Sequence, residues 1–507
     1  MDIALATVAL ISLLAVDSTK EARTDGANPS LHAAVATRQS YLNGAPLFLP
    51  SLMRYAHREN LTTVRTDYLW RAQQRQVEPP EGLAEQHVAL RASSFMHLSK
   101  RITTYGYAAY CHERTRGVAF LNSSDFHITF PYTSATEAGG TDRKSSYSFS
   151  GGCDIAIPLG TLGLEVQYRA MQMHRTIDPR PLNVISDFHG RAGYSLPISQ
   201  QYLLAGVLRA DVYKQSSDVS IYNPQVEPLY LLMNGLGNSF FRRNISDSPI
   251  LYRMRGFGGG LALRPKERTG VWGSVDFMWK KLTRYAVEAN VAPINRYTEP
   301  SWQVYLGYIG TVGTWTLGGG LTYTHALRYG RDYILGSSDI REYKLLGTVP
   351  NYAHERIEGK LELAAEASQR YGVRYALGGV YCRQLQNAPL LALTRTSLIN
   401  NLSGYATLPM GRQWLRLSAL VQCLTPMYNW SSQVLPASYT AAPLERYTLL
   451  YAAMHSTLEL GGSLTAAVML TLSPRFLLEV GARASVAQYG SNNLRYAAIG
   501  ELALHFQ

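Results

Sequence analysis

Two histidines, a serine and an aspartate fall within one short stretch of the chain: His174, Ser186, Asp187 and His189. A serine hydroxyl can attack an ester or amide carbonyl when a histidine takes its proton and an aspartate orients that histidine. The chain has 12 histidines in 507 residues, so one such neighbourhood is expected by chance. We therefore expect no catalytic residues and no enzyme, with a hydrolase acting on lipid or peptide as an alternative.

Neither the glycines nor the cysteines form a recognisable cofactor or metal motif. The glycine-rich stretch 256–260 lacks the Lys-Ser/Thr end of a phosphate-binding loop, and the residues after it continue as a strand. The cysteines Cys111, Cys153, Cys382 and Cys423 include no C-x-x-C pair. We expect four unpaired thiols, with a Cys111–Cys153 disulfide left open, and we expect no cofactor and no metal.

Charged residues of both signs alternate with apolar ones along many segments. They are Glu165, Arg169, Arg209, Asp211, Glu358, Lys360, Glu362, Glu366, Arg374, Glu459, Glu479, Arg483, Arg495 and Glu501. A long stripe of one sign would indicate a charged conduit or binding cavity, which stays an alternative. Because the signs are mixed within single segments, and because isolated buried charge is costly, the pattern favours an interior filled by ion pairs.

The segments that carry these charges have one apolar face. Apolar side chains occupy alternate positions, with aromatic rings near one or both ends of each segment: Leu162, Leu164, Val166 and Tyr168; Trp315, Leu317, Leu321 and Tyr323; Tyr371, Val373, Tyr375, Leu377 and Tyr381. Residues i and i+2 lie on one face of a strand. The headgroup layers of a bilayer favour rings at strand ends, so the pattern predicts an all-β, antiparallel transmembrane β-barrel.

Short turns and longer connections alternate along the chain. The turns lie at 158–160, 197–199, 264–267, 311–312, 368–370, 409–411 and 473–475, and long connections such as 114–144, 214–250 and 425–446 separate them. Such asymmetry is typical of barrels with periplasmic turns and extracellular loops, and it predicts about 16 strands, in a range of roughly 14 to 18. The last segment, 494–506, resembles a C-terminal barrel-assembly signal, except that Gln507 follows its aromatic residue.

Three regions are expected along the chain. Residues 1–18 hold an apolar stretch followed by polar residues, which resembles a secretory signal apart from Asp2 in place of a basic residue. Residues 19–92 lack alternation and contain turn signals, so we expect a periplasmic or plug segment there. Residues 93–507 are expected to form the barrel.

The charge balance sets the expected surroundings. The net charge of +12 favours anionic partners, for which outer-membrane lipid and the phosphates of lipopolysaccharide suffice. No nucleic-acid-binding module is recognisable, so we expect no nucleic acid as a partner. The expected location is the bacterial outer membrane.

Short motifs in the first half of the chain resemble a family. Ser124-Asp125-Phe126-His127, Phe130-Pro131-Tyr132, 147–152 and Asp178-Pro179-Arg180-Pro181 are similar to segments of an uncharacterised outer-membrane β-barrel family of Bacteroidota. The resemblance covers the chain beyond residue 90. The family has no assigned activity, so no site residue carries over. What the resemblance implies is an outer-membrane location and work beside a TonB-dependent transporter or a surface lipoprotein.

The expected function is that of a non-enzymatic component of a transport or surface-binding assembly. Apolar residues at 228–233 and 240–243 either pack over the barrel mouth or bind a partner. The fold does not name the cargo, because one barrel architecture serves many functions. A hatch-type channel for hydrophobic small molecules is the alternative, and Asn28-Pro29-Ser30 resembles the start of such a hatch.

Overall fold

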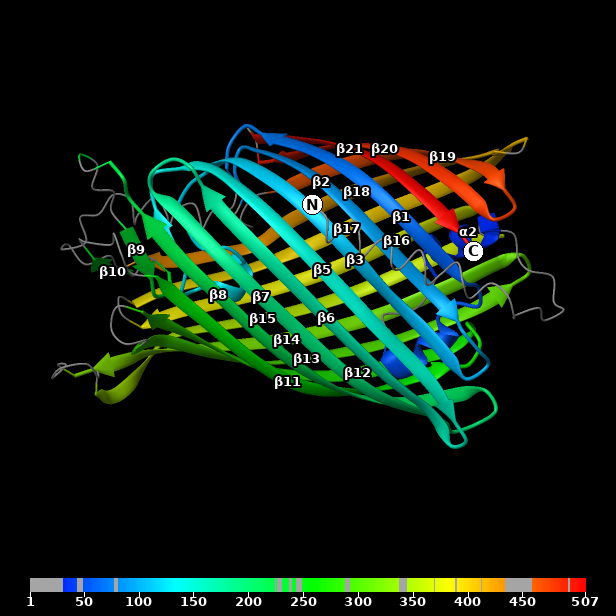
Figure 1. Ribbon diagram of the computed structural model, residues 1–507, viewed down its shortest axis with the longest axis horizontal. Coiled ribbons are helices and arrows are strands. Elements are labelled where there is room, and N and C mark those ends of the chain that lie inside the picture. The colour runs from blue at the N-terminus through cyan, green and yellow to red at the C-terminus, as the bar shows by residue number, and fades with distance from the viewer. Residues whose placement is uncertain are drawn as a thin grey trace.

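Eighteen strands form one closed antiparallel sheet in the described part of the chain (Figure 1). The computed structural model describes residues 31–42, 49–76, 81–223, 225, 230–236, 239–242, 249–287, 292–336, 344–368, 370–387, 390–411, 413–433, 458–490 and 493–507. The predicted barrel is confirmed. The predicted count of about 16 strands is wrong, because the wall has 18. The signal-like segment 1–18 lies outside the described residues.

The wall strands follow one another around the barrel in chain order. They are β1 (Leu61–Gln73), β2 (Ala84–His97), β3 (Ile102–Val118), β5 (Gly140–Ile157), β6 (Gly160–Arg175), β7 (Arg180–Pro197), β8 (Tyr202–Ser220), β11 (Ile250–Pro265), β12 (Gly270–Ala286), β13 (Ala292–Val312), β14 (Trp315–Leu335), β15 (Leu345–Ala367), β16 (Tyr371–Asn387), β17 (Leu390–Met410), β18 (Gln413–Gln433), β19 (Glu459–Ser473), β20 (Phe476–Tyr489) and β21 (Asn493–Phe506). The first strand pairs with both β2 and β21, which closes the sheet.

The wall begins at Leu61, inside the range 19–92 for which the sequence predicts a plug. The alternation of β1 is weak: Leu69 lies on its inner face and Thr66 on its outer face. Pairing with β21 overrides this weak pattern, because an unpaired sheet edge in lipid would leave backbone N–H and C=O groups without partners. The strands β1 and β2 are the two that the predicted count omits.

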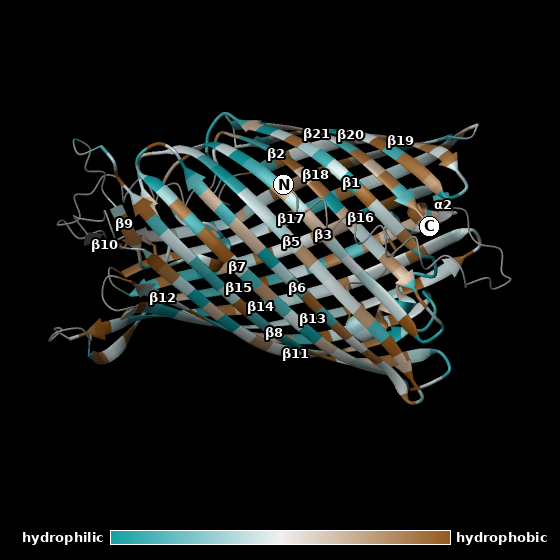
Figure 2. Ribbon diagram, in the orientation of Figure 1, coloured by the Kyte–Doolittle hydropathy of each residue, from teal (hydrophilic) through white to brown (hydrophobic). Residues whose placement is uncertain are grey.

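The two faces of the wall differ as the alternation predicts. On β6, Leu164 and Val166 are 60% and 54% exposed on the outside, while the intervening Glu165 is 7% exposed. Figure 2 shows hydrophobic and hydrophilic positions alternating along the strands. A closed barrel with an apolar outer belt is the architecture of outer-membrane proteins, and this protein is an integral barrel of the bacterial outer membrane. No helix in the described ranges is long and apolar enough to cross a bilayer.

The two ends of the barrel are built differently. Connections of a few residues, such as 158–159 between β5 and β6, gather at the end where α2 (Leu31–Arg38) lies (Figure 1). The longer connections gather at the other end, with β4 (Ser134–Thr136), β9 (Tyr230–Met233) and β10 (Ser239–Arg242). Since outer-membrane barrels have short periplasmic turns and long extracellular loops, we call these the inner end and the outer end.

Candidate functional site

The outer end is filled by its own connections. The segment between β3 and β5 contains the short helix α3 (Phe126–Thr129) and β4, which pairs with β9 from the connection between β8 and β11. Leu231 and Met233 of β9 are fully buried. The described part of the apolar cluster 228–233 therefore packs within the barrel mouth, which is the first of the two uses predicted for it. The side chains of 240–243 lie outside the described part.

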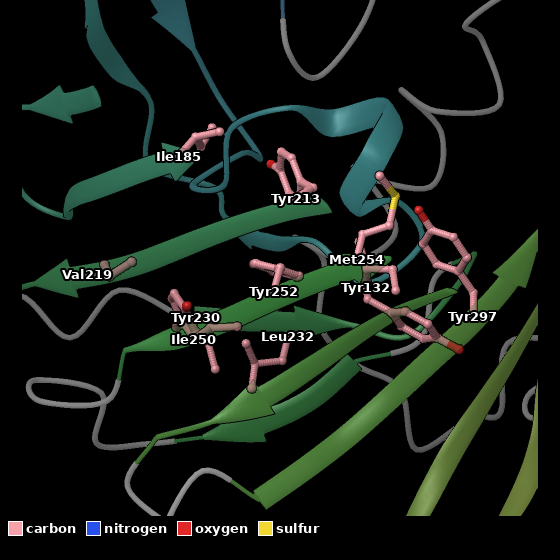
Figure 3. Packing of buried hydrophobic residues seen from close by; sticks show 11 residues of the cluster. Tyr132, Ile185, Tyr213, Val219, Tyr230, Leu232, Ile250, Tyr252, Met254 and Tyr297 are labelled. Carbon is pink, nitrogen blue, oxygen red and sulfur yellow. The ribbon is translucent and has the colours of Figure 1, made fainter. Parts of the chain in front are cut away.

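Tyrosines join these connections to the wall. A buried cluster combines Tyr132 and Tyr230 of the connections with Tyr213, Tyr252 and Tyr297 of the wall strands (Figure 3). The Tyr132 hydroxyl donates to the Arg296 carbonyl at 3.1 Å, and the Tyr297 hydroxyl donates to the Ile128 carbonyl at 2.7 Å. A buried tyrosine ring contributes apolar packing while its hydroxyl fixes a polar partner. The outer connections are thus packed against the wall and hydrogen-bonded to it.

Arg284 ties the same connections together. Its side chain is fully buried on β12, and its Nη1 donates to the Met233 carbonyl at 2.9 Å. Its Nη2 donates to Asn234 Oδ1 at 2.6 Å and its Nε to Asn295 Oδ1 at 2.7 Å. Asn295 in turn donates to Asp332 at 2.6 Å. One guanidinium therefore joins β9, its following residue and the wall strand β13.

The predicted hydrolase residues split between the two faces of the wall. Asp187 and His189 point inward on β7, whereas Ser186 lies on its outward face and His174 on the outward face of β6. Ser186 pairs with Ala170, four positions along β6 from His174, or roughly 13 Å. A nucleophile and its base must lie within hydrogen-bond reach, so these four residues do not form a catalytic group.

The two inward residues belong to an ion-pair network instead. The Arg169 guanidinium lies 2.6 Å from Asp125 of the β3–β5 connection and 3.1 Å from Asp187. His189 has Nε2 at 3.1 Å from Asp187 and Nδ1 at 2.8 Å from Asp211. Both ring nitrogens of His189 therefore face carboxylates and not the Ser186 hydroxyl, which lies on the other face of β7. The network fastens the outer connection to β6, β7 and β8.

Between the two ends the wall carries the predicted mixture of charges on its inner face. Arg209 is 2.5 Å from Asp276, Lys360 is 2.9 Å from Glu362, and Arg374 pairs with the same Glu362. The interior ion pairs that the alternation predicts are confirmed at these positions. The side chains of Arg356 and Lys360 are still 55% and 44% exposed, so the middle of the barrel is accessible to water.

The chain's N-terminal part closes the inner end from inside. After α2, the short helix η2 (Pro50–Tyr55) packs on the wall, and wall side chains bind the backbone of η2 and of the residues that follow α2. Glu366 accepts from the Tyr41 amide at 2.6 Å, and Asp154 accepts from the Arg54 amide at 2.6 Å. Arg416 donates to the Gln39 carbonyl at 3.0 Å. We call residues 31–59 of the described chain the inner segment.

Two histidines of the inner segment are held in surroundings that disfavour their charge. Burial, together with the positive charges of Arg38 and Arg268, lowers the pKa of His57 to about 3. Burial and the nearby Arg370 also lower the pKa of His32, whose ring stacks on Trp414 at 4.1 Å. The docked segment therefore binds fewer protons than a released one would in mildly acidic solution.

Sequence reasoning places Glu366 among the interior charges but does not predict its part in the inner closure, and it misses Arg284 and Asp154. Arg284, Asp154 and Glu366 each lie on an inward face, and alternation could identify that much. The partners of such residues lie in other parts of the chain. Glu366 and Tyr41 are 325 residues apart, and Arg416 and Gln39 are 377 residues apart. No sequence signal gives these pairings. The four described cysteines are free, and no group of three or more His, Cys, Asp or Glu in the described ranges could hold a metal ion.

Among solved structures, two receptors and a transporter are similar to this chain. The ferric yersiniabactin uptake receptor FyuA from Yersinia pestis is 10% identical with a TM-score of 0.44, over 88% of this chain and 80% of that chain. The ferric preacinetobactin receptor BauA from Acinetobacter baumannii is 8% identical with a TM-score of 0.39, over 88% and 80%. The copper transporter OprC is 9% identical with a TM-score of 0.40, over 87% and 80%.

Comparison with sequence families is more specific. No curated protein matches the sequence. A family model described as a family of unknown function, DUF6850, matches residues 50–501, which spans most of the barrel wall and η2. The origin in Bacteroidota stays a prediction. The chain belongs to the family of unknown function DUF6850.

Proposed function

We propose that the protein is a gated, non-enzymatic transport barrel for a polar solute, closed at rest by its own inner segment and its own outer connections. The observation that carries the proposal is the pair of closures at opposite ends of a wall whose middle is charged and accessible to water. A structural plug alone would not require the exposed inward side chains of Arg356 and Lys360 between the closures.

The charges inside favour a polar or charged solute over a hydrophobic one. Arg209 with Asp276 and Glu362 with Lys360 offer both donors and acceptors along the wall. Such groups bind a solute that can replace part of their hydration, whereas an apolar solute would leave them without partners. This disfavours the alternative of a channel for hydrophobic small molecules.

Opening of the barrel requires the inner segment to detach from the wall. This requirement is the reason for proposing an assembly with a second protein. Several backbone groups of that segment are bound by wall residues, among them the Tyr41 and Arg54 amides. Each hydrogen bond of this kind contributes on the order of 1 kcal/mol, so release of the whole segment calls for an external input. A TonB-dependent transporter or a surface lipoprotein is the partner we propose.

A pull-down in gentle detergent from native membranes tests the assembly. We expect recovery of a larger transporter or a surface lipoprotein in fixed ratio to this chain. A matched variant lacks residues 31–59 and keeps the outward surface unchanged. It tests whether the inner segment contributes to the contact with the partner protein. Recovery of the chain alone with a bound fatty-acid-like molecule would instead favour the channel for hydrophobic molecules.

A further inference from the structure

Basic side chains face outward near the outer end of five neighbouring strands. We call the following six residues the basic band: Lys214 on β8, Arg253 and Arg255 on β11, Lys281 on β12, Arg296 on β13 and Arg331 on β14. They share the outward parity of apolar residues nearer the middle of their strands, such as Val212, Phe257 and Leu261. The band therefore lies on the lipid-facing surface and not in the interior.

Within the basic band, residues of like charge stand directly opposite each other. The strand register pairs Lys214 with Arg253, Arg255 with Lys281, and Arg296 with Arg331. Like charges at directly opposed positions of an antiparallel pair destabilise a sheet. Among the described residues, no carboxylate forms an ion pair with any of the six. Within the described residues, the repulsion in each pair therefore has no compensating ion pair.

Aromatic rings fix the level of the basic band in the membrane. Phe257 and Trp279 form an outward ring pair with centroids 5.1 Å apart, one ladder step nearer the membrane centre than the opposed pair Arg255 and Lys281. Further out, Arg253 lies over the Tyr285 ring at 5.3 Å. Outward rings near strand ends mark the boundary between hydrocarbon and headgroups. The basic band consequently lies in the headgroup layer of the outer leaflet.

The strands next to the basic band, β15 to β17, carry outward charges of both signs. There Glu355 on β15 stands opposite Arg383 on β16, and His325 lies 3.1 Å from the same Glu355. The next strand presents Thr394 opposite Arg383. The outward charge of Glu355 is thus balanced by its neighbours. The run of opposed like charges ends at β14 on this side, and a separate outward pair, Arg114 opposite Arg143, lies on β3 and β5.

We propose that the basic band binds the phosphate groups of a phosphorylated lipid in the outer leaflet. Arginine and lysine side chains bind phosphate oxygens through charge-assisted hydrogen bonds, and arginine can do so with two parallel bonds. Phosphates between the opposed pairs would remove the repulsion within each pair. The apolar belt below the band, with Phe257 and Leu261 exposed, is the surface that acyl chains of the same lipid would cover.

The test compares two variants that each remove four positive charges. The band variant is K214Q/R253Q/R255Q/R331Q, and the control K100Q/R101Q/K266Q/R475Q removes the same charge from turns at the inner end. The full-length proteins in detergent micelles are titrated with lipid A, which carries two phosphates, and with the same lipid after enzymatic removal of both phosphates. Inorganic phosphate serves as a competitor, and native mass spectrometry counts the bound lipid.

For the wild-type barrel we expect at least about tenfold tighter binding of lipid A than of its dephosphorylated form, since several basic groups at the membrane surface each add to the attraction for anionic lipid. The band variant loses this preference and the control keeps it within about twofold. A preference that survives in the band variant overturns the proposal. Displacement of lipid A by an equal concentration of inorganic phosphate also overturns it, because the site would then bind free phosphate. If the band variant fails to fold, the pair R255Q/K281Q is measured against the same outcomes.

Discussion

Arg284 is fully buried at the outer end, and its partners are the Met233 carbonyl and the amide oxygens of Asn234 and Asn295. Replacing it with methionine keeps much of the volume and removes this donor from all three oxygens, of which Asn234 Oδ1 keeps the Asn295 amide at 3.3 Å. We expect the outer connections to lose about 3 kcal/mol of docking free energy, because each buried acceptor without a partner costs on the order of 1–3 kcal/mol.

Limited proteolysis of Arg284→Met in intact cells measures this, with cleavage expected within 119–139. Arg383→Gln is the matched control, because Arg383 lies on the outward face of β16, opposite Glu355 and outside the basic band. Equal resistance of Arg284→Met and wild type to proteolysis would show that the outer closure does not depend on this guanidinium.

The histidines of the inner segment predict a dependence on pH. A released His57 has its ordinary pKa near 6.5, and burial in the docked state lowers that pKa to about 3. The released state binds more protons, so docking is fully stable above pH 6.5 and weakens as the pH falls through that value. At pH 5 the loss is about 2 kcal/mol for this one group.

Hydrogen exchange of residues 49–57 at pH 7.5 and pH 5 checks this, with faster exchange expected at pH 5. His57→Gln cannot gain the proton, so its exchange should change much less between the two conditions. The same large acceleration in His57→Gln and wild type would remove His57 as the cause.

At the scale of elements, close contact between η2 and the wall depends on a glycine of β6. A Cβ atom at Gly163 would lie 2.2 Å from the backbone of Pro50 and Ser51. Gly163→Ala should therefore displace η2 while the wall strands stay paired. Gly151→Ala on the neighbouring β5 is the matched control, since a Cβ there meets no atom within 4 Å.

Exchange of the η2 amides should rise in Gly163→Ala and stay as in wild type in Gly151→Ala, with the thermal unfolding of the barrel close to unchanged in both. If the η2 amides of Gly163→Ala exchange no faster than those of wild type, the contact at Gly163 does not fix η2.

Alternation of apolar and polar residues predicts a strand and its two faces where the pattern within that strand is regular. Leu162, Leu164 and Val166 face outward and Glu165 inward, as expected. The same reasoning fails for β1, where Leu69 faces inward, because pairing with β2 and β21 decides the state of that segment. The hydrolase prediction fails for a related reason: Ser186 and His189 differ in parity, so one strand carries them on opposite faces.

At the scale of the whole molecule, the sequence predicts a barrel but not its closures. The wall forms from strands that are neighbours in the chain, so local patterns carry the information. The closures form from contacts such as Tyr132 with Arg296, which are 164 residues apart. The sequence predicts a long connection at 114–144, but only tertiary contacts show that residues 119–139 of it fold into the barrel mouth.

Conductance in planar bilayers tests the central proposal of two closures in series most directly. Four proteins are compared: wild type, a deletion of residues 31–59, a variant in which short Gly-Ser linkers replace 122–134 and 221–249, and the combination. The first linker is feasible because the Phe120 amide donates to the Thr136 carbonyl at 2.9 Å, so the ends of the excised segment lie side by side. The second linker joins the ends of β8 and β11, which are paired at Ser217 and Ile250. We predict stable open channels only in the combined variant, since either closure alone blocks the path. Large steady channels in wild type, or a combined variant that stays closed, would contradict a gated conduit with these two closures.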